Sequence, residues 1–253
     1  MRTVSVGGSS VGYHDSGERE GKAVIFVHGS GGSSFSFTPV FAGLKGKMRM
    51  LIPDLPGHGE SGGASPKSIG EYSQWVRSFL TAIGVSDFII VGHSMGGAIA
   101  QHLALHKPPG LGGIVLISTG AKLKVHAKIF EGLKDDFGNF CRWLSGMVVG
   151  KNAPVELKEE ISKQLMMTTP SVFLNDFRCC DEFDIRERLG EIDAPALIIA
   201  GTEDVLTPLY YAEYLAQNIR NATLKTINKT GHSPVLEAPG IVNKAILEFV
   251  ATH

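Results

Sequence analysis

Long apolar runs and a large net charge are both missing from this sequence. Its 253 residues include 24 Lys or Arg and 25 Asp or Glu, which gives a formal net charge of −1. The longest apolar stretches hold four or five residues and lie at 23–27, 88–91, 114–117 and 196–200. A helix needs about 20 apolar residues to span a bilayer, and a balanced charge attracts neither nucleic acid nor an anionic membrane. We therefore expect a small molecule as the partner of a monomer or homodimer, and no nucleic acid or membrane.

Cysteine is also scarce. The chain has three, Cys141, Cys179 and Cys180, and adjacent Cα atoms lie about 3.8 Å apart, below the usual range for a disulfide. An odd count without Cys-x-x-Cys spacing favours free thiols over a redox or metal-binding pair. Residues 1–17 hold no apolar run of the length that a signal peptide requires. Free thiols belong to a reducing compartment, so we expect a cytoplasmic protein.

The short apolar stretches are rich in Val and Ile and are bounded by Gly or Pro. Such segments are typical of strands buried on both faces of a parallel sheet. Helical spacing lies between them, most clearly over residues 68–84, where Ser68 and Glu71 fit a capping box. The alternation predicts an α/β fold with a mostly parallel central sheet flanked by helices. Residues 3–15 predict an antiparallel hairpin at the sheet edge.

One segment interrupts the alternation. Residues 121–189 contain no convincing strand and are typical of several short helices, one with an apolar stripe over residues 157–165. An insertion of this size in a series of strands and helices predicts a helical lid, or cap, over the sheet. Residues 1–120 and 190–253 then form the core, and residues 121–189 form the lid. The alternative is a pair of ordinary crossover helices.

The motif Gly-x-Ser-x-Gly occurs three times, at residues 8–12, 59–63 and 92–96. In a glycine-rich chain the pattern alone is weak, so its context decides. The first copy lies in the predicted hairpin, and the second has no strand before it. The third leaves the strand at 88–91 and enters a helix, which is the context in which a nucleophilic serine stands exposed on a sharp turn.

Ser94 is the serine of this third copy. Side chains two positions before and after it would collide with neighbouring backbone, so Gly92 and Gly96 fit the turn. The helix behind it directs N-terminal amides and a positive dipole end toward a developing oxyanion. We interpret Ser94 as the candidate nucleophile, against the alternative of a glycine-rich turn without chemistry.

A base and an orienting acid are expected at the carboxyl ends of later strands. Asp204 follows the strand at 196–200 and His232 follows the strand at 223–227, which gives the order Ser…Asp…His. Glu203 adjoins Asp204 and is the alternative acid, although the register to a following proline favours Asp204. These residues predict a catalytic triad.

Several motifs follow one another in an order that resembles a known family, and they extend over nearly the whole chain. They include His-Gly-Ser-Gly-Gly at 28–32, Asp-Leu-Pro-Gly-His-Gly-Glu-Ser at 54–61, the Ser94 motif, and the segments that hold Asp204 and His232. The chain resembles the α/β-hydrolase superfamily, in its lid-bearing branch of serine esterases and C–C hydrolases. Loops of the His-Gly-Gly-Gly type in that superfamily aim a backbone amide at the site.

The resemblance implies a role for each residue. Ser94 is then the nucleophile, His232 the general base and Asp204 its orienting partner. The backbone amides of Met95 and Ser30 form the implied oxyanion hole. Neither a metal nor an organic cofactor is implied.

Other polar residues near these motifs have alternatives that stay open. Gly31 competes with Ser30 for the second oxyanion amide. His102 and His106 stand four residues apart on one helix, but no third metal ligand suggests itself. The remaining candidates fit packing or loop hydrogen bonding rather than chemistry, and they are His28, His58, His93 and Glu237.

The implied reaction is transfer of an acyl group to water by a carboxylesterase that acts on small to medium hydrophobic esters. A C–C hydrolase of ring meta-cleavage products is the first alternative, although Ser233 stands where many such enzymes carry Trp. The alternative from another class is a non-catalytic, ligand-sensing hydrolase fold. We expect apolar lid residues to line the acyl pocket, with the inventory Phe130, Phe137, Phe140, Trp143, Met147, Val148 and Phe173.

Overall fold

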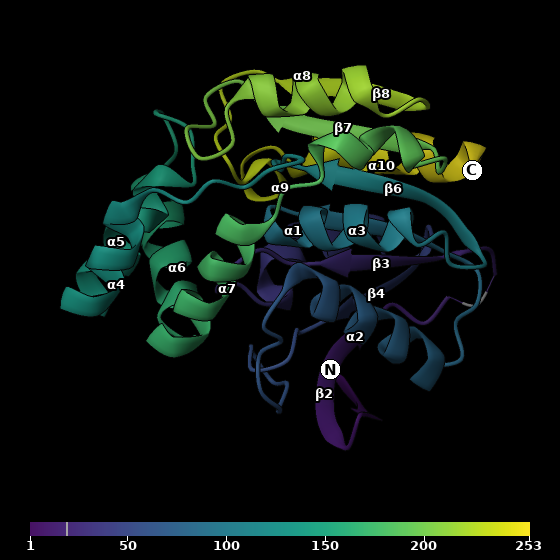
Figure 1. The fold of residues 1–253 in the computed structure, drawn as a ribbon, viewed down its shortest axis with the longest axis horizontal. Coiled ribbons are helices and arrows are strands. Elements are labelled where there is room, and N and C mark those ends of the chain that lie inside the picture. Colours follow the sequence, from purple (N-terminus) through teal and green to yellow (C-terminus); the bar gives the residue numbers. More distant parts are fainter. Residues whose placement is uncertain (19) are drawn as a thin grey trace.

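A single sheet forms the centre of the computed structural model, which describes residues 1–18 and 20–253. Its eight strands have the order β1-β2-β4-β3-β5-β6-β7-β8. Six of them run parallel, namely β3 (Ala23–Val27), β4 (Arg49–Pro53), β5 (Phe88–His93), β6 (Leu111–Ile117), β7 (Ala196–Gly201) and β8 (Ala222–Ile227). Helices cover the sheet (Figure 1). The predicted α/β architecture is confirmed.

The antiparallel part is the hairpin at the chain's start. β1 (Arg2–Val6) pairs with β2 (Ser9–Asp15), and β2 pairs with β4. The turn residues Gly7 and Gly8 have φ values of 58° and 85°. Glycine adopts this left-handed region without steric cost, which suits a two-residue hairpin turn. The hairpin expected at the sheet edge is therefore present.

Both faces of the sheet are covered. The strand β3 illustrates this, since all five of its residues are buried. Ala23, Ile25 and Val27 pack on one face with α2 (Ile69–Ala82), α3 (Met95–Leu105) and α8 (Leu209–Asn218). Val24 and Phe26 pack on the other face with α1 (Thr38–Leu44) and α10 (Pro239–Thr252). The short elements η1 (Ser34–Phe37) and α9 (Pro234–Glu237) adjoin this second face.

The start of α2 follows its sequence signal with one difference. The Ser68 hydroxyl accepts a hydrogen bond from the Glu71 amide at 3.1 Å. The Glu71 carboxylate accepts from the amide of Lys67 at 2.8 Å, one residue earlier than a capping box requires. The helix ends at Ala82, and Gly84 then takes a φ of 68° that leads the chain away.

Between β6 and β7 the described residues form helices and no strand of the sheet. These are α4 (Ala127–Asp135), α5 (Phe137–Met147), α6 (Val155–Leu165), α7 (Pro170–Glu182) and the 3₁₀ segment η2 (Arg186–Glu191). Figure 1 shows α4 to α7 gathered beyond the end at which β6 and β7 finish. They share an apolar cluster of their own, which includes Phe140, Leu144 and Phe173. No described helix combines the length and the apolar character needed to cross a membrane.

Candidate active site

Ser94 occupies a strained turn between β5 and α3. Its φ of 53° and ψ of −116° lie outside the regions that L-residues favour, and such a conformation costs about 1–3 kcal/mol. The flanking residues Gly92 and Gly96 must be glycine because other backbone atoms lie where their side chains would be. A Cβ on Gly92 would lie 2.1 Å from the carbonyl oxygen of Gly96, and one on Gly96 would lie 2.1 Å from that of Val27. The turn therefore lifts the Ser94 hydroxyl out of the sheet at the start of α3.

The structure brings Ser94, His232 and Asp204 together from three loops. His232 Nε2 lies 2.9 Å from Ser94 Oγ, and His232 Nδ1 lies 2.8 Å from Asp204 Oδ2. The carboxylate only accepts, so Nδ1 carries the proton and Nε2 accepts from the serine hydroxyl. His232 is 4% exposed and Asp204 is 5% exposed. The imidazole is therefore oriented to take the serine proton.

The Asp204 carboxylate is held on both of its oxygens. Oδ1 accepts from the amides of Leu206 and Thr207 at 2.9 Å each, and Oδ2 accepts from the Thr207 hydroxyl at 2.8 Å. Burial alone raises the pKa of Asp204, but the charge of His232 and the hydrogen bonds from His232 and Thr207 outweigh it and hold this pKa below its ordinary value. Asp204 is thus an acceptor-only partner for His232.

Two glutamates near His232 and Asp204 bind the connection between α5 and α6. Glu237 accepts from the amides of Gly231 and Gly150, at 2.8 and 2.7 Å, so it tethers the loop before His232. Glu203 accepts from the amide of Lys151 at 2.7 Å and is only partly exposed. The Glu203 carboxylate thus binds the 150–151 segment, which folds back over this loop.

His93 makes a buried hydrogen bond to the backbone of His232. Its Nε2 donates to the carbonyl oxygen of His232 at 2.7 Å, and the two rings lie 5.1 Å apart. Burial, followed by the charge of His232, lowers the pKa of His93 to about 4. A neutral His93 therefore holds the backbone of His232 in place, through a contact between loops that sequence patterns do not reveal.

Two neighbouring amides in the loop after β3 differ in their hydrogen bonding. The amide of Gly31 donates to Asp176 Oδ2 at 2.8 Å. In the part of the chain that the structure describes, no acceptor binds the amide of Ser30. The amide of Met95 opens α3 and has no acceptor within that helix. Among the described residues, the amides of Ser30 and Met95 are thus both left without an acceptor next to Ser94.

Two cavities meet at Ser94. The smaller is about 100 Å³ and is lined by apolar side chains that include Leu144, Val148, Ile161 and Leu165. The larger, about 350 Å³, extends past Ile129 and Thr207 toward Tyr210. The residues that line both are Ser30, Ser94, Leu144, Phe177, Leu206 and His232.

Most of the expected pocket residues of segment 121–189 lie elsewhere. Of the seven, Val148 alone lines either of these two cavities, among the residues that the structure describes. Phe140 and Phe173 pack in the helices' own cluster, and Trp143 is 45% exposed. These helices carry apolar side chains of two kinds, those that pack between the helices and those that line a cavity. The spacing along the sequence does not distinguish the two kinds.

The other motif residues have structural positions. His28 Nδ1 donates to the Gly29 carbonyl and its Nε2 accepts from the Leu55 amide, and its pKa is lowered to about 3, first by burial. His102 and His106 have ring centres 4.5 Å apart. Among residues 1–18 and 20–253, no three His, Cys, Asp or Glu side chains are placed to hold a metal ion.

The cysteines are buried and free. Burial raises the pKa of Cys141 to about 11 and that of Cys179 to about 12. Cys180 lies with its sulfur 3.4 Å from the Ser30 hydroxyl, and burial raises its pKa as well. These thiols are therefore poorly suited to form thiolates.

The serine of the second motif copy ties the hairpin to the core. Ser61 Oγ donates to the carbonyl oxygen of Asp54 at 2.7 Å and accepts from the amide of Gly12 at 3.0 Å. We expect Ser61→Ala to lower the free energy of unfolding by about 1–3 kcal/mol, because two buried backbone groups lose their partner. Urea unfolding measures this loss.

The matched control is Ser10→Ala, at an exposed position of the hairpin, where a surface substitution changes stability by about 0.5 kcal/mol or less. Because neither serine lies at the Ser94 site, both variants should keep their turnover of any substrate within about twofold. A folded Ser61→Ala protein without turnover would contradict this separation of roles.

The family model described as "Alpha/beta hydrolase family" matches residues 24–245. The hydrolase YugF of Bacillus subtilis strain 168 is 30% identical, over 99% of this chain and 97% of that protein. The 3-oxoadipate enol-lactonase 1 of Acinetobacter baylyi is 26% identical, over 92% of this chain and 90% of that protein.

A solved structure described as a thermophilic esterase superposes closely on the chain. Its TM-score is 0.87 at 30% sequence identity, and the match covers 99% of this chain and 97% of the other. The two chains therefore share one fold along nearly their whole length.

Proposed function

Since the chain belongs to the alpha/beta hydrolase family, we propose that it is a serine hydrolase that cleaves carboxylic esters through an acyl-enzyme on Ser94. The observation that carries the proposal is the continuous line of hydrogen bonds from Ser94 through His232 to Asp204, with distances of 2.9 and 2.8 Å. A base that is positioned by a third group is the mark of an activated nucleophile. The esterase and lactonase names of its relatives support the same reaction class.

The first half-reaction begins at His232 Nε2. This nitrogen takes the hydroxyl proton of Ser94 while Oγ attacks the ester carbonyl carbon. The carbonyl oxygen becomes an oxyanion that accepts from the amides of Ser30 and Met95. The Asp204 carboxylate, 2.8 Å from His232 Nδ1, stabilises the imidazolium that forms. The bond to the alcohol oxygen then breaks, and His232 returns the proton to the departing alcohol.

Water completes the cycle. It enters where the alcohol was, gives a proton to His232 Nε2 and attacks the acyl carbon. The second oxyanion collapses, the bond to Ser94 Oγ breaks, and the serine recovers its proton from His232. The products are a carboxylic acid and an alcohol, and no metal or cofactor takes part in the proposed steps.

The two cavities suggest where each half of an ester lies. The alcohol departs first, so it suits the larger cavity, whose rim includes Val205 and Tyr210, 54% and 63% exposed. The acyl group stays attached to Ser94 and suits the smaller cavity, about 100 Å³, beneath α5 and α6. In this proposal the helices of residues 121–189 act as a lid that shapes both sites.

A pair of alanine variants tests this assignment. Ile161 lines the smaller cavity and Ile129 the larger one, and both are buried, at 6% and 7% exposed. We expect Ile161→Ala to raise kcat/KM for longer acyl chains about tenfold, since one methylene in a pocket is worth about 1–3 kcal/mol.

Ile129→Ala should change the preference for the alcohol and leave the acyl preference as it is. Two chromogenic ester series, one with varied acyl chains and one with varied alcohols, measure both effects. If Ile161→Ala altered alcohol preference alone, the two cavities would have to exchange roles.

Labelling with an active-site phosphonate tests the function itself. A phosphonate with a good leaving group should attach to Ser94 in a single turnover, and mass spectrometry of the peptide locates it. An unlabelled Ser94 in folded protein would overturn the proposal. Labelling without turnover of any ester or lactone would support the ligand-sensing alternative, and turnover of a ring meta-cleavage product alone would support C–C hydrolysis.

A further inference from the structure

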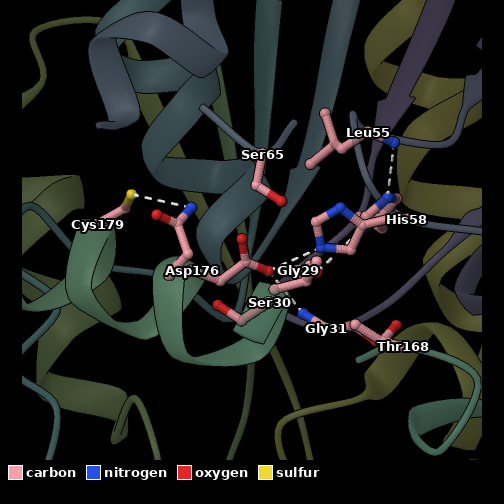
Figure 2. Close-up of polar contacts among 12 residues, drawn as sticks. Gly29, Ser30, Gly31, Leu55, His58, Ser65, Thr168, Asp176 and Cys179 are labelled. Carbon is pink, nitrogen blue, oxygen red and sulfur yellow. Dashed lines mark hydrogen bonds and ion pairs between the residues drawn. The ribbon is translucent and has the colours of Figure 1, made fainter. Parts of the chain in front are cut away.

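A second buried charged group lies close to the triad, on α7. Asp176 is fully buried, at 0% exposed, and accepts three hydrogen bonds. Its Oδ2 accepts from the Gly31 amide and from His58 Nε2, both at 2.8 Å, and its Oδ1 accepts from the Tyr72 hydroxyl at 2.6 Å. Figure 2 shows Asp176 reaching from α7 toward Gly31 and His58. One carboxylate thus joins α7 and α2 to the loops after β3 and β4.

His58 and Asp176 form an ion pair. Both ring nitrogens of His58 face acceptors, since Nδ1 lies 3.0 Å from the Pro56 carbonyl oxygen and Nε2 lies 2.8 Å from Asp176 Oδ2. A histidine that donates from both nitrogens is an imidazolium. Burial alone lowers the pKa of His58, but the charge and hydrogen bond of Asp176 outweigh it and raise this pKa above its ordinary value.

Most groups around the pair are neutral. The pKa of His28 is lowered to about 3, by burial first and by the His58 charge second, and burial raises the pKa values of Tyr72, Cys179 and Cys180. Asp54 is the other acidic side chain whose charge acts on His58. The Asp176 carboxylate therefore has the His58 imidazolium as its immediate counter-charge.

Gly31 is held from several directions by this part of the chain. Its amide donates to Asp176, and its carbonyl oxygen accepts from the Thr168 hydroxyl at 2.9 Å. Its φ is 62°, and the Phe173 ring lies 2.0 Å from where a Cβ would be. Figure 2 shows Thr168 and Asp176 on opposite sides of Gly31. Gly31 therefore has its backbone fixed by residues of the proposed lid.

We propose that Asp176 is a positioning residue for the oxyanion hole: by holding the Gly31 amide it fixes the loop so that the neighbouring Ser30 amide faces the carbonyl oxygen of an ester at Ser94. The inference rests on the function proposed above. Asp176 touches no substrate, and it acts through the loop, with His58 as its counter-charge. It follows that the oxyanion hole is complete only while α7 is docked.

The main test compares two substitutions of the same kind on one helix. Asp176→Asn keeps the size of the side chain but removes the charge and one acceptor. Asp181→Asn is the control, because the Asp181 carboxylate binds the Val125 amide and Lys124 rather than the amide of Gly31. We expect Asp176→Asn to lower kcat about 10–100-fold, since loss of a whole oxyanion donor costs about 100–1,000-fold. KM should change less than threefold, and Asp181→Asn should stay within twofold of wild type.

A transition-state analogue separates positioning from mere stability. An alkyl trifluoromethyl ketone forms a tetrahedral oxyanion on Ser94, so its affinity should fall in Asp176→Asn by the same factor as kcat/KM. Tyr72→Phe removes a hydrogen bond from the other oxygen of Asp176 and leaves the Gly31 contact. It should lower Tm while kcat and analogue affinity stay within threefold.

Two further measurements keep the test informative. Should Asp176→Asn fail to fold, Thr168→Val removes only the hydrogen bond to the Gly31 carbonyl and should lower kcat several-fold at constant KM.

The stability of the fold should also depend on pH through His58. Because the pKa of His58 is raised in the folded state, the stabilising pair of His58 and Asp176 is fully present below pH about 6.5 and is lost as pH rises through the raised value. The Tm difference between wild type and Asp176→Asn should therefore be largest below pH about 6.5.

The outcomes are distinguishable. In one outcome, the wild type hydrolyses esters while folded Asp176→Asn keeps the same kcat and the same analogue affinity as the wild type. That result would overturn this inference and leave the proposed function standing. Equal losses of kcat in Tyr72→Phe and Asp176→Asn would also overturn it, because the effect would then come from packing. A wild type that neither turns over esters nor reacts with the phosphonate would remove the proposed function and this inference with it.

Discussion

Ser94→Ala is expected to lower kcat for a chromogenic ester by a factor on the order of 10⁴–10⁶, the scale seen when a serine hydrolase loses its nucleophile. Among the described residues, Ser94 supplies the hydroxyl that meets His232 Nε2, at 2.9 Å, whereas the Thr207 hydroxyl lies at the other ring nitrogen. The fold should survive, because alanine fits wherever serine does and the buried glycines at 92 and 96 are unchanged.

Circular dichroism and thermal unfolding establish that the variant is folded, and stopped assays at high enzyme concentration set the limit on kcat. KM, or the affinity of a non-hydrolysable analogue, should change little because the cavities remain. Turnover by folded Ser94→Ala within tenfold of the wild type would show that the nucleophile lies elsewhere.

Asp204→Asn has the next largest expected effect. Oδ1 accepts from two amides, and Oδ2 accepts from His232 and Thr207. Asparagine has one carbonyl oxygen, so its NH₂ group must face donors on one side or the other. If it faces His232, the ring takes the wrong tautomer, and kcat should fall by about 10³–10⁴ with little change in KM.

Glu203→Gln is the matched control on the same loop. A glutamine oxygen still accepts from the Lys151 amide, which Glu203 binds at 2.7 Å. The control should therefore change kcat less than about threefold. Measuring both variants at saturating substrate assigns the acid: the reverse ranking would move it to Glu203, and two nearly active variants would mean that His232 has another partner.

Local patterns were sufficient for the sheet and the Ser94 turn. Strands buried on both faces are continuous apolar runs, and Gly92 and Gly96 are required by contacts inside one short segment. The candidate triad was accessible for a similar reason, since parallel strands bring their carboxyl ends to one edge and the loop residues that follow them converge. Both inferences use spacing along the chain.

Contacts between distant segments were not accessible in this way. His58 and Asp176 are 118 positions apart, and His93 meets the carbonyl of His232 139 positions away. Neither pair has a spacing that marks it, because a buried ion pair depends on how α7 packs against loops. The same limit applied to Glu203, whose partner lies in the connection between α5 and α6.

Strand order also determines when a growing chain becomes chemically competent. The turn at Ser94 needs β3, β5 and α3, whereas β7 and β8 join one edge of the sheet last, and His232 follows β8, 138 positions after Ser94. Ribosomes add about 5–20 residues per second, so that stretch takes on the order of ten seconds to make. During that interval the serine has no base and is a weak nucleophile. Under the proposed mechanism, the nascent chain therefore carries an inert hydroxyl until β8 docks and His232 reaches Ser94.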